Sequence, residues 1–181
     1  MTGVYEKQRL TPYGEYVPLL WRPFVGEQDL YTAGDGPQLL TLGDRRLGTM
    51  ICSEAIDADL VRRLVREGAE LLVNIAHDGW WGTGAARTQH LQAAALRAVE
   101  NRRFLLRVTS DGVSAIVDPR GVLVQTAPTG EPAVLTATVA THRTTSVYTR
   151  HGDVFGCLCV GVTLALLAIL PWRSRRGSAA D

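Results

Sequence analysis

Cys52, Glu54 and Lys7 are of the residue types that carry out acyl transfer. Cys52 follows the apolar stretch 47–51 and precedes a turn, where a thiol is exposed beyond a sheet edge and can attack a carbonyl carbon. Lys7 is the only lysine among 19 basic residues, and arginine does not replace a compact ammonium. A thiol, a carboxylate two residues later and a single upstream ammonium together suggest an acyl-transfer site in which the three groups cooperate.

Each of these residues also has a structural explanation. Cys52 fits an inert thiol of the core, Glu54 fits a favourable acid in the first turn of a helix, and Lys7 fits a surface charge. Adjacent His77 and Asp78 are tempting as an acid and base pair, but neighbours in the chain point in different directions, so His77 is interpreted as a loop residue.

Metal and disulfide sites are not expected. Cys157 and Cys159 lie inside an apolar run, which leaves one thiol for the rest of the chain and offers no four-ligand zinc site. The other histidines, His90, His142 and His151, share no ligand spacing. No metal or other cofactor is therefore predicted.

Composition bounds the fold and the partners. The chain has 181 residues, of which 46% are hydrophobic, enough for one domain with a real core. Its net charge of +1 supplies no cationic field for nucleic acid, which is excluded as a partner.

Alternating strand and helix patterns predict an α/β or α+β layered domain. Strands are expected over 39–42, 47–52, 71–75, 104–109, 113–117, 122–125 and 134–139, and helices over 59–67 and 88–101. Turns are expected at Gly43-Asp44 and over 118–121, and a helix stop at Gly68.

An uncharged apolar run closes the chain. It covers the 17 residues 154–170, at the lower limit of a membrane span, and Trp172 and three arginines follow it. This flank is typical of a helix that leaves a bilayer on its cytoplasmic side. The expected organisation is a catalytic domain over 1–140, a linker over 141–153, a transmembrane helix over 154–172 and a basic cytoplasmic tail over 173–181; a buried core helix is the alternative for the run.

Four ordered segments resemble a known family. They are YEKQRLTPYGEYVPL from residue 5, GTMICSE from residue 48, LLVNIAHDGWWG from residue 71 and QHLQAAALRAVENRRFLLRVTSDGVSAIVDPRG from residue 89. Together they resemble the apolipoprotein N-acyltransferases, a membrane branch of the nitrilase (carbon-nitrogen hydrolase) superfamily. The resemblance implies an αββα sandwich.

Site roles follow from that resemblance. It implies that Cys52 is the nucleophile, that Lys7 holds the tetrahedral oxyanion, and that Glu15 is a second carboxylate near the lysine. Glu54 matches a carboxylate that is important in the acyltransferase branch. Glu15 also fits a turn cap.

Substrate contacts are implied as well. Trp80 and Trp81 match a pair on a loop beside the active site, although they also fit a core, and Tyr16 lies in the same motif as Glu15. Ser53 departs from the family, because many members carry an aromatic residue after the nucleophile.

The implied reaction moves a fatty acyl group from a membrane phospholipid, through a cysteine thioester, to the amino group of a diacylglyceryl-cysteine apolipoprotein. The implied location is the lipid bilayer of a bacterial inner membrane, with the catalytic domain on the extracytoplasmic side. The family's glutamate base lies well upstream of its lysine, and only Glu6 is an acid before Lys7, so the domain is expected to be N-terminally incomplete. The alternatives are a catalytically incomplete fragment and a nitrilase-type amidase that acts on a small amide.

Overall fold

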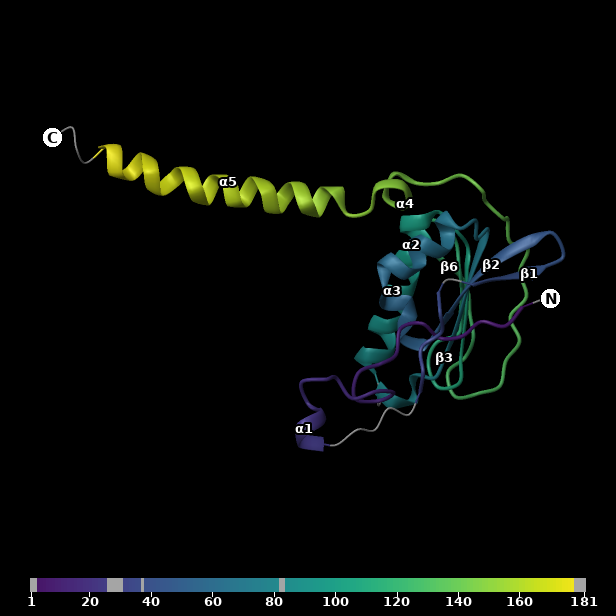
Figure 1. Cartoon of the computed structure of the whole chain (residues 1–181). Coiled ribbons are helices and arrows are strands. Elements are labelled where there is room, and N and C mark those ends of the chain that lie inside the picture. The colour runs from purple at the N-terminus through teal and green to yellow at the C-terminus, as the bar shows by residue number, and fades with distance from the viewer. Residues whose placement is uncertain (1–2, 26–30, 37, 82–83, 178–181) are drawn as a thin grey trace. The chain divides into compact units, whose positions relative to one another are not determined.

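Six strands form one mixed sheet in which neighbours in the chain are neighbours in space (Figure 1). They are β1 (Leu39–Leu42), β2 (Arg45–Ile51), β3 (Leu71–Ala76), β4 (Leu105–Thr109), β5 (Ala115–Val117) and β6 (Leu123–Thr126). β2, β3 and β4 run parallel, and the outer pairs are antiparallel. This computed structural model describes residues 3–25, 31–36, 38–81 and 84–177. The predicted layered α/β class is confirmed.

Helices α2 (Ala58–Arg66) and α3 (Ala85–Asn101) cover one face of the sheet (Figure 1). The side chain of Asp57 accepts a hydrogen bond from the N–H of Leu60 at 2.9 Å and so caps the start of α2. Gly68, with φ of +107°, ends this helical stretch in a conformation that suits glycine. The remaining helices are α1 (Arg22–Val25), the 3₁₀ turns η1 (Cys52–Ile56) and η2 (Asp78–Trp81), α4 (Val147–His151) and α5 (Val154–Gly177).

The parallel strands present an apolar side chain to each face. Met50, Leu72 and Leu105 are completely buried against α2 and α3 in the main core. Leu71 and the half-buried Leu106 belong to a smaller cluster on the opposite face. Strands with apolar residues on both faces are typical of a sheet that is covered on both sides.

Residues 133–139 run across this opposite face without forming the strand that the sequence predicts. A cavity of about 400 Å³ separates the segment from β4 and β5. The segment pairs with none of the described strands, so its backbone has no ladder partner there and β-propensity alone does not make it a strand.

A cluster of charged side chains binds the segment that contains Arg143 to the sheet. The buried carboxylate of Glu70 accepts hydrogen bonds from Arg45 at 3.2 Å and from Arg143 at 3.1 Å. Burial raises the pKa of Glu70, but these two guanidinium groups outweigh it and leave the pKa below its ordinary value. Ser146 and Thr149 add hydrogen bonds to Glu100 and Asn101 at the end of α3.

The chain divides into two units, residues 1–150 and 151–181. The second contains α5, so the predicted apolar run is helical. Within the described residues, no helix has both the length and the apolar character that a membrane crossing requires, so the predicted span over 154–172 is unconfirmed.

Truncation of Leu72 tests which face of β3 carries the stability of the first unit. Leu72→Ala removes a completely buried side chain and is expected to lower the free energy of unfolding by about 2–5 kcal/mol. Urea denaturation measures the change. Ile75→Ala, on the same strand but 55% exposed, is the matched control and should cost clearly less. Equal losses would contradict the assignment of the main core to the helix-covered face.

Candidate active site

The nucleophile candidate stands at the point where β2 becomes η1. Cys52 has φ of +53°, a left-handed conformation that is unfavourable for a residue with a side chain. Its Sγ lies 3.9 Å from the carbonyl oxygen of His77, just beyond the end of the neighbouring parallel strand β3. A half-buried thiol on a strained strand-to-helix turn matches the geometry expected for an attacking group.

Lys7 and Glu15 form a close ion pair. The Nζ of Lys7 lies 2.7 Å from both carboxylate oxygens of Glu15, and the lysine side chain is only 10% exposed. The backbone N–H of Thr11 donates to the same carboxylate at 2.6 Å. Burial raises the pKa of Glu15, but the hydrogen bond from Lys7 and the donors of Thr11 outweigh it, so the pKa lies below its ordinary value.

A hydroxyl pair connects the lysine to the cysteine turn. Lys7 Nζ lies 3.4 Å from the Oγ1 of Thr11, and this hydroxyl lies 2.9 Å from the Oγ of Ser53. Ser53 directly follows Cys52. Two segments more than 40 residues apart in the chain therefore meet at one edge of the sheet.

Glu54 makes a second and stronger connection between the same two segments. Its carboxylate is completely buried and accepts hydrogen bonds from the N–H groups of Gln8 at 2.7 Å and Arg9 at 3.0 Å. The other oxygen accepts from the N–H of Ile51 at 2.7 Å and from the hydroxyl of Tyr5 at 3.0 Å. The contact with Ile51 is one half of a capping box at the start of η1.

Tyr5 remains a donor in this arrangement. Burial raises the pKa of its hydroxyl, and the negative charge of Glu54 raises it further. Both oxygens of Glu54 are thus occupied by donors from residues 5–9 and from the end of β2. The structure places Glu54 between the lysine segment and the cysteine turn.

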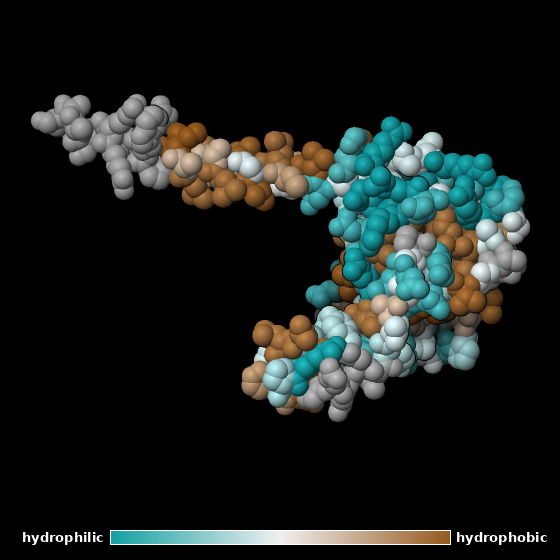
Figure 2. Space-filling model, viewed as in Figure 1, coloured by the Kyte–Doolittle hydropathy of each residue, from teal (hydrophilic) through white to brown (hydrophobic). Residues whose placement is uncertain are grey.

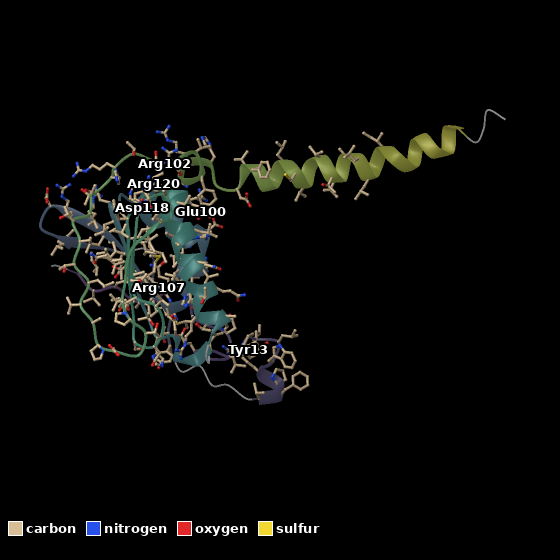
Figure 3. The ribbon with its side chains drawn as sticks, turned by 180° about the vertical axis from the view of Figure 1, so that it is seen from behind. Tyr13, Glu100, Arg102, Arg107, Asp118 and Arg120 are labelled. Carbon is tan, nitrogen blue, oxygen red and sulfur yellow. The ribbon has the colours of Figure 1, made fainter. Side chains whose placement is uncertain are left out.

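A buried polar network lies beneath Cys52 on the helix-covered side of the sheet. Asn74 of β3 and Arg107 of β4 are register partners and share a side-chain hydrogen bond. Arg107, labelled inside the unit in Figure 3, donates to Asp78 at 2.7 Å. Asp78 in turn contacts the Nδ1 of His90 of α3 at 2.8 Å. All four side chains are buried, so no solvent screens these contacts.

The sequence patterns do not reveal this network. They place Asp78 beside His77 and give His90 no partner, whereas Asp78 meets His90 in space. His77 is exposed and contacts Ser110 and Asp111. The sequence does contain one sign of it: each of two apolar strands carries a polar residue within it, Asn74 in LLVNI and Arg107 in LLRVT. These two residues are neighbours in the register of β3 and β4.

The predicted substrate contacts are placed only in part. Trp80 and Trp81 belong to η2 by their backbone, and their side chains lie outside what the structure describes. Tyr16 is half-buried, and its carbonyl accepts a hydrogen bond from the N–H of Tyr13 at 2.8 Å in the turn that presents Glu15.

Comparison with known sequences finds one family. The family model described as carbon-nitrogen hydrolase matches residues 1–149. Among curated relatives, an apolipoprotein N-acyltransferase of Geobacter metallireducens is 39% identical over 96% of this chain and 34% of its own length. One of Pasteurella multocida is 34% identical over 92% of this chain and 33% of its own length. The chain thus spans about a third of the length of these relatives.

Solved structures agree on the fold. A carbon-nitrogen hydrolase from Helicobacter pylori has a TM-score of 0.56 at 21% identity, over 69% of this chain and 47% of that one. A nitrilase-superfamily amidase from Nesterenkonia has a TM-score of 0.54 at 23% identity, over 71% and 47%. At these identities the likeness shows the fold alone.

Glu54→Gln tests the connection that Glu54 makes. The glutamine amide places an N–H₂ donor against N–H groups that need an acceptor, so we expect a loss of about 1–3 kcal/mol in the free energy of unfolding. Urea denaturation measures it. Glu67→Gln replaces an exposed glutamate and should leave stability unchanged; a Glu54→Gln variant as stable as that control would contradict these contacts.

Glu15→Gln tests the ion pair through pH. Because the folded pKa of Glu15 lies below the unfolded value, ordinarily 4.5, its stabilisation is fully present above that value and is lost as pH falls through the lower folded pKa. The difference in unfolding free energy between wild type and Glu15→Gln should therefore be constant from neutral pH down to about 4.5 and shrink below it. Denaturation curves across this range decide it, with exposed Glu6→Gln as the control. A difference that grows on acidification would refute the assigned direction.

Proposed function

The chain belongs to the carbon-nitrogen hydrolase family, and from its site we propose that it carries the acyl-transfer centre of an apolipoprotein N-acyltransferase. Cys52 is the nucleophile of this proposal, and Lys7 is the cation that stabilises the oxyanion. Glu15 holds the ammonium in place, and Glu54 acts as a positioning residue.

One observation carries the proposal: the segment of Lys7 is attached to the turn of Cys52 by a fully buried carboxylate. The bonds from Glu54 to the N–H groups of Gln8 and Arg9 fix the backbone on the carboxyl side of Lys7. The hydroxyl pair of Thr11 and Ser53 joins the same segment to the residue that follows Cys52. A preorganised cation beside a nucleophile is the arrangement that stabilises charge developing on a carbonyl oxygen.

The proposed reaction has two balanced halves. In the first, Cys52 sulfur bonds to the ester carbonyl carbon of a phospholipid, the ester C–O bond breaks, and the thiol proton ends on the departing lysophospholipid hydroxyl. In the second, the amino nitrogen of a diacylglyceryl-cysteine apolipoprotein bonds to the thioester carbonyl carbon, the C–S bond breaks, and a proton of the amine ends on the sulfur of Cys52. This double displacement requires that the acyl-enzyme survive until the acceptor arrives.

An exposed apolar patch next to Glu15 supports a lipid as the acyl donor. The patch consists of Tyr13, Leu19, Leu20, Trp21 and Phe24, and its two leucines are 79% and 80% exposed. Trp21 lies 6.4 Å from Tyr13 and 6.0 Å from Phe24 between ring centroids. The brown surface over α1 in Figure 2 belongs to this patch. Large exposed apolar patches mark surfaces that meet other apolar groups, here acyl chains.

The place of the reaction remains a prediction within this proposal. The uncharged run 154–170 and the arginines after it support a location at a bacterial inner membrane, with residues 1–150 outside the cytoplasm. The amidases that share the fold leave one rival activity, hydrolysis of a small amide. Capture of an acyl group on the thiol separates the two activities.

Acyl capture tests the proposed function directly. The 181-residue chain is incubated with vesicles of phosphatidylethanolamine that carry a labelled acyl chain, and Cys52 is examined by peptide mass spectrometry. We expect a hydroxylamine-sensitive acyl group on Cys52, which a synthetic diacylglyceryl-cysteine peptide then removes as its N-acyl product.

Cys52→Ser should abolish the hydroxylamine-sensitive adduct, whereas Cys157→Ser, which replaces an exposed thiol, should not change it. A hydroxylamine-sensitive adduct that persists in Cys52→Ser would refute the assigned nucleophile. Release of ammonia from a small amide such as propionamide, without any lipid-derived adduct, would favour the amidase.

A further inference from the structure

The carbonyl oxygen of Cys52 points into the buried network. The Nε2 of His90 lies 3.2 Å from this oxygen, and the Nδ2 of Asn74 lies 3.4 Å from it. A carbonyl oxygen can only accept a hydrogen bond, so this contact is a hydrogen bond in the form of His90 that carries a hydrogen on Nε2. Of these two side-chain contacts with the carbonyl of Cys52, the shorter comes from α3, 38 residues further along the chain.

The direction of this carbonyl determines the direction of the next N–H group. The described chain contains no cis peptide bonds, so the peptide between Cys52 and Ser53 is planar and trans. In such a peptide the C=O and the N–H point in opposite directions. A carbonyl directed inward to His90 consequently directs the N–H of Ser53 away from the core, on the side of the peptide opposite the network.

The Cys52 turn needs external support to keep this orientation. Its φ of +53° is unfavourable for a non-glycine residue and persists only where surrounding contacts impose it. His90 is itself fixed, because its Nδ1 contacts Asp78 at 2.8 Å and Asp78 accepts from Arg107 at 2.7 Å. The residues of this chain of contacts are buried.

We propose that His90 is a positioning residue for acyl transfer. By binding the carbonyl of Cys52 it keeps the N–H of Ser53 aimed at the oxyanion that forms when the Cys52 thiolate attacks an ester. Asp78 and Arg107 keep the imidazole ring in the orientation that this bond requires. The inference rests on the proposed function in one respect, that the bond formed by Cys52 is to a carbonyl carbon.

Two reactions of the same thiol separate a loss of oxyanion stabilisation from a general loss of thiol reactivity or of folded protein. p-Nitrophenyl acetate acylates Cys52 through a tetrahedral oxyanion and releases p-nitrophenol, whereas iodoacetamide alkylates it by displacement at a saturated carbon, with loss of iodide and no oxyanion. Both rates are measured on the full chain in a Cys157→Ser, Cys159→Ser background. His90→Leu should slow acylation by about 10²-fold, the usual cost of losing one oxyanion donor, and leave alkylation unchanged.

His90→Gln supplies an amide donor in place of the imidazole and should recover most of the acylation rate. His90→Asn keeps a polar group but shortens it, and should behave like His90→Leu, which preserves the test if the leucine variant fails to fold. His151→Leu, at an exposed histidine, is the matched control and should change neither rate. Equal losses of acylation and alkylation, or no loss of either, would overturn the proposal.

A spectroscopic measurement keeps the inference separable from the proposed function. Residues 52 and 53 form the only Cys-Ser dipeptide in the sequence, so carbonyl-¹³C cysteine and ¹⁵N serine labelling yields a single HNCO cross-peak. In His90→Leu the ¹³C signal of Cys52 should move upfield, as expected when a carbonyl loses a donor, and in His151→Leu it should stay.

Wild type that alkylates but never acylates would count against the proposed function alone, and the carbonyl shift would still decide the role of His90. An unmoved cross-peak in His90→Leu would refute that role.

Discussion

The buried carboxylate of Glu54 is the constraint from which the site follows, because an ionised group removed from water is stable only where donors surround it. Its four donors come from two places: Tyr5, Gln8 and Arg9 on the N-terminal segment, and Ile51 at the end of β2. The donors can satisfy the carboxylate only if the two segments lie together. The cost of burying one charge thus brings the lysine segment to the turn of Cys52.

A second buried polar group secures the same turn from the opposite side. Glu54 acts on the loop side of Cys52, and the network of His90, Asp78 and Arg107 acts from beneath the sheet edge. Between them lies a residue in a left-handed conformation that neither neighbour in the chain would impose. The apolar core stabilises the fold as a whole, while these two polar contacts fix the orientation of the backbone around Cys52.

Much of this arrangement could be predicted from the sequence, and the remainder had identifiable obstacles. Periodicity located the strands and helices, and the place of Cys52 after an apolar strand indicated the turn. Pairing across the fold was not visible: His90 and Asp78 are 12 residues apart, and only the packing of α3 on the sheet brings them together. Residues 134–139 have the composition of a strand but pair with no described strand. A strand needs a partner to pair with, and the composition of one segment does not show whether a partner is present.

We propose that Glu54 acts on the chemistry through Lys7, and a double-mutant cycle on the acylation rate distinguishes this role from an independent one. The rate of Cys52 acylation by p-nitrophenyl acetate is measured in wild type, Lys7→Met, Glu54→Gln and the double variant. If Glu54 serves to hold the lysine segment, the double variant will be no slower than Lys7→Met alone. If the two losses multiply, Glu54 and Lys7 act independently, and the positioning role of Glu54 is contradicted.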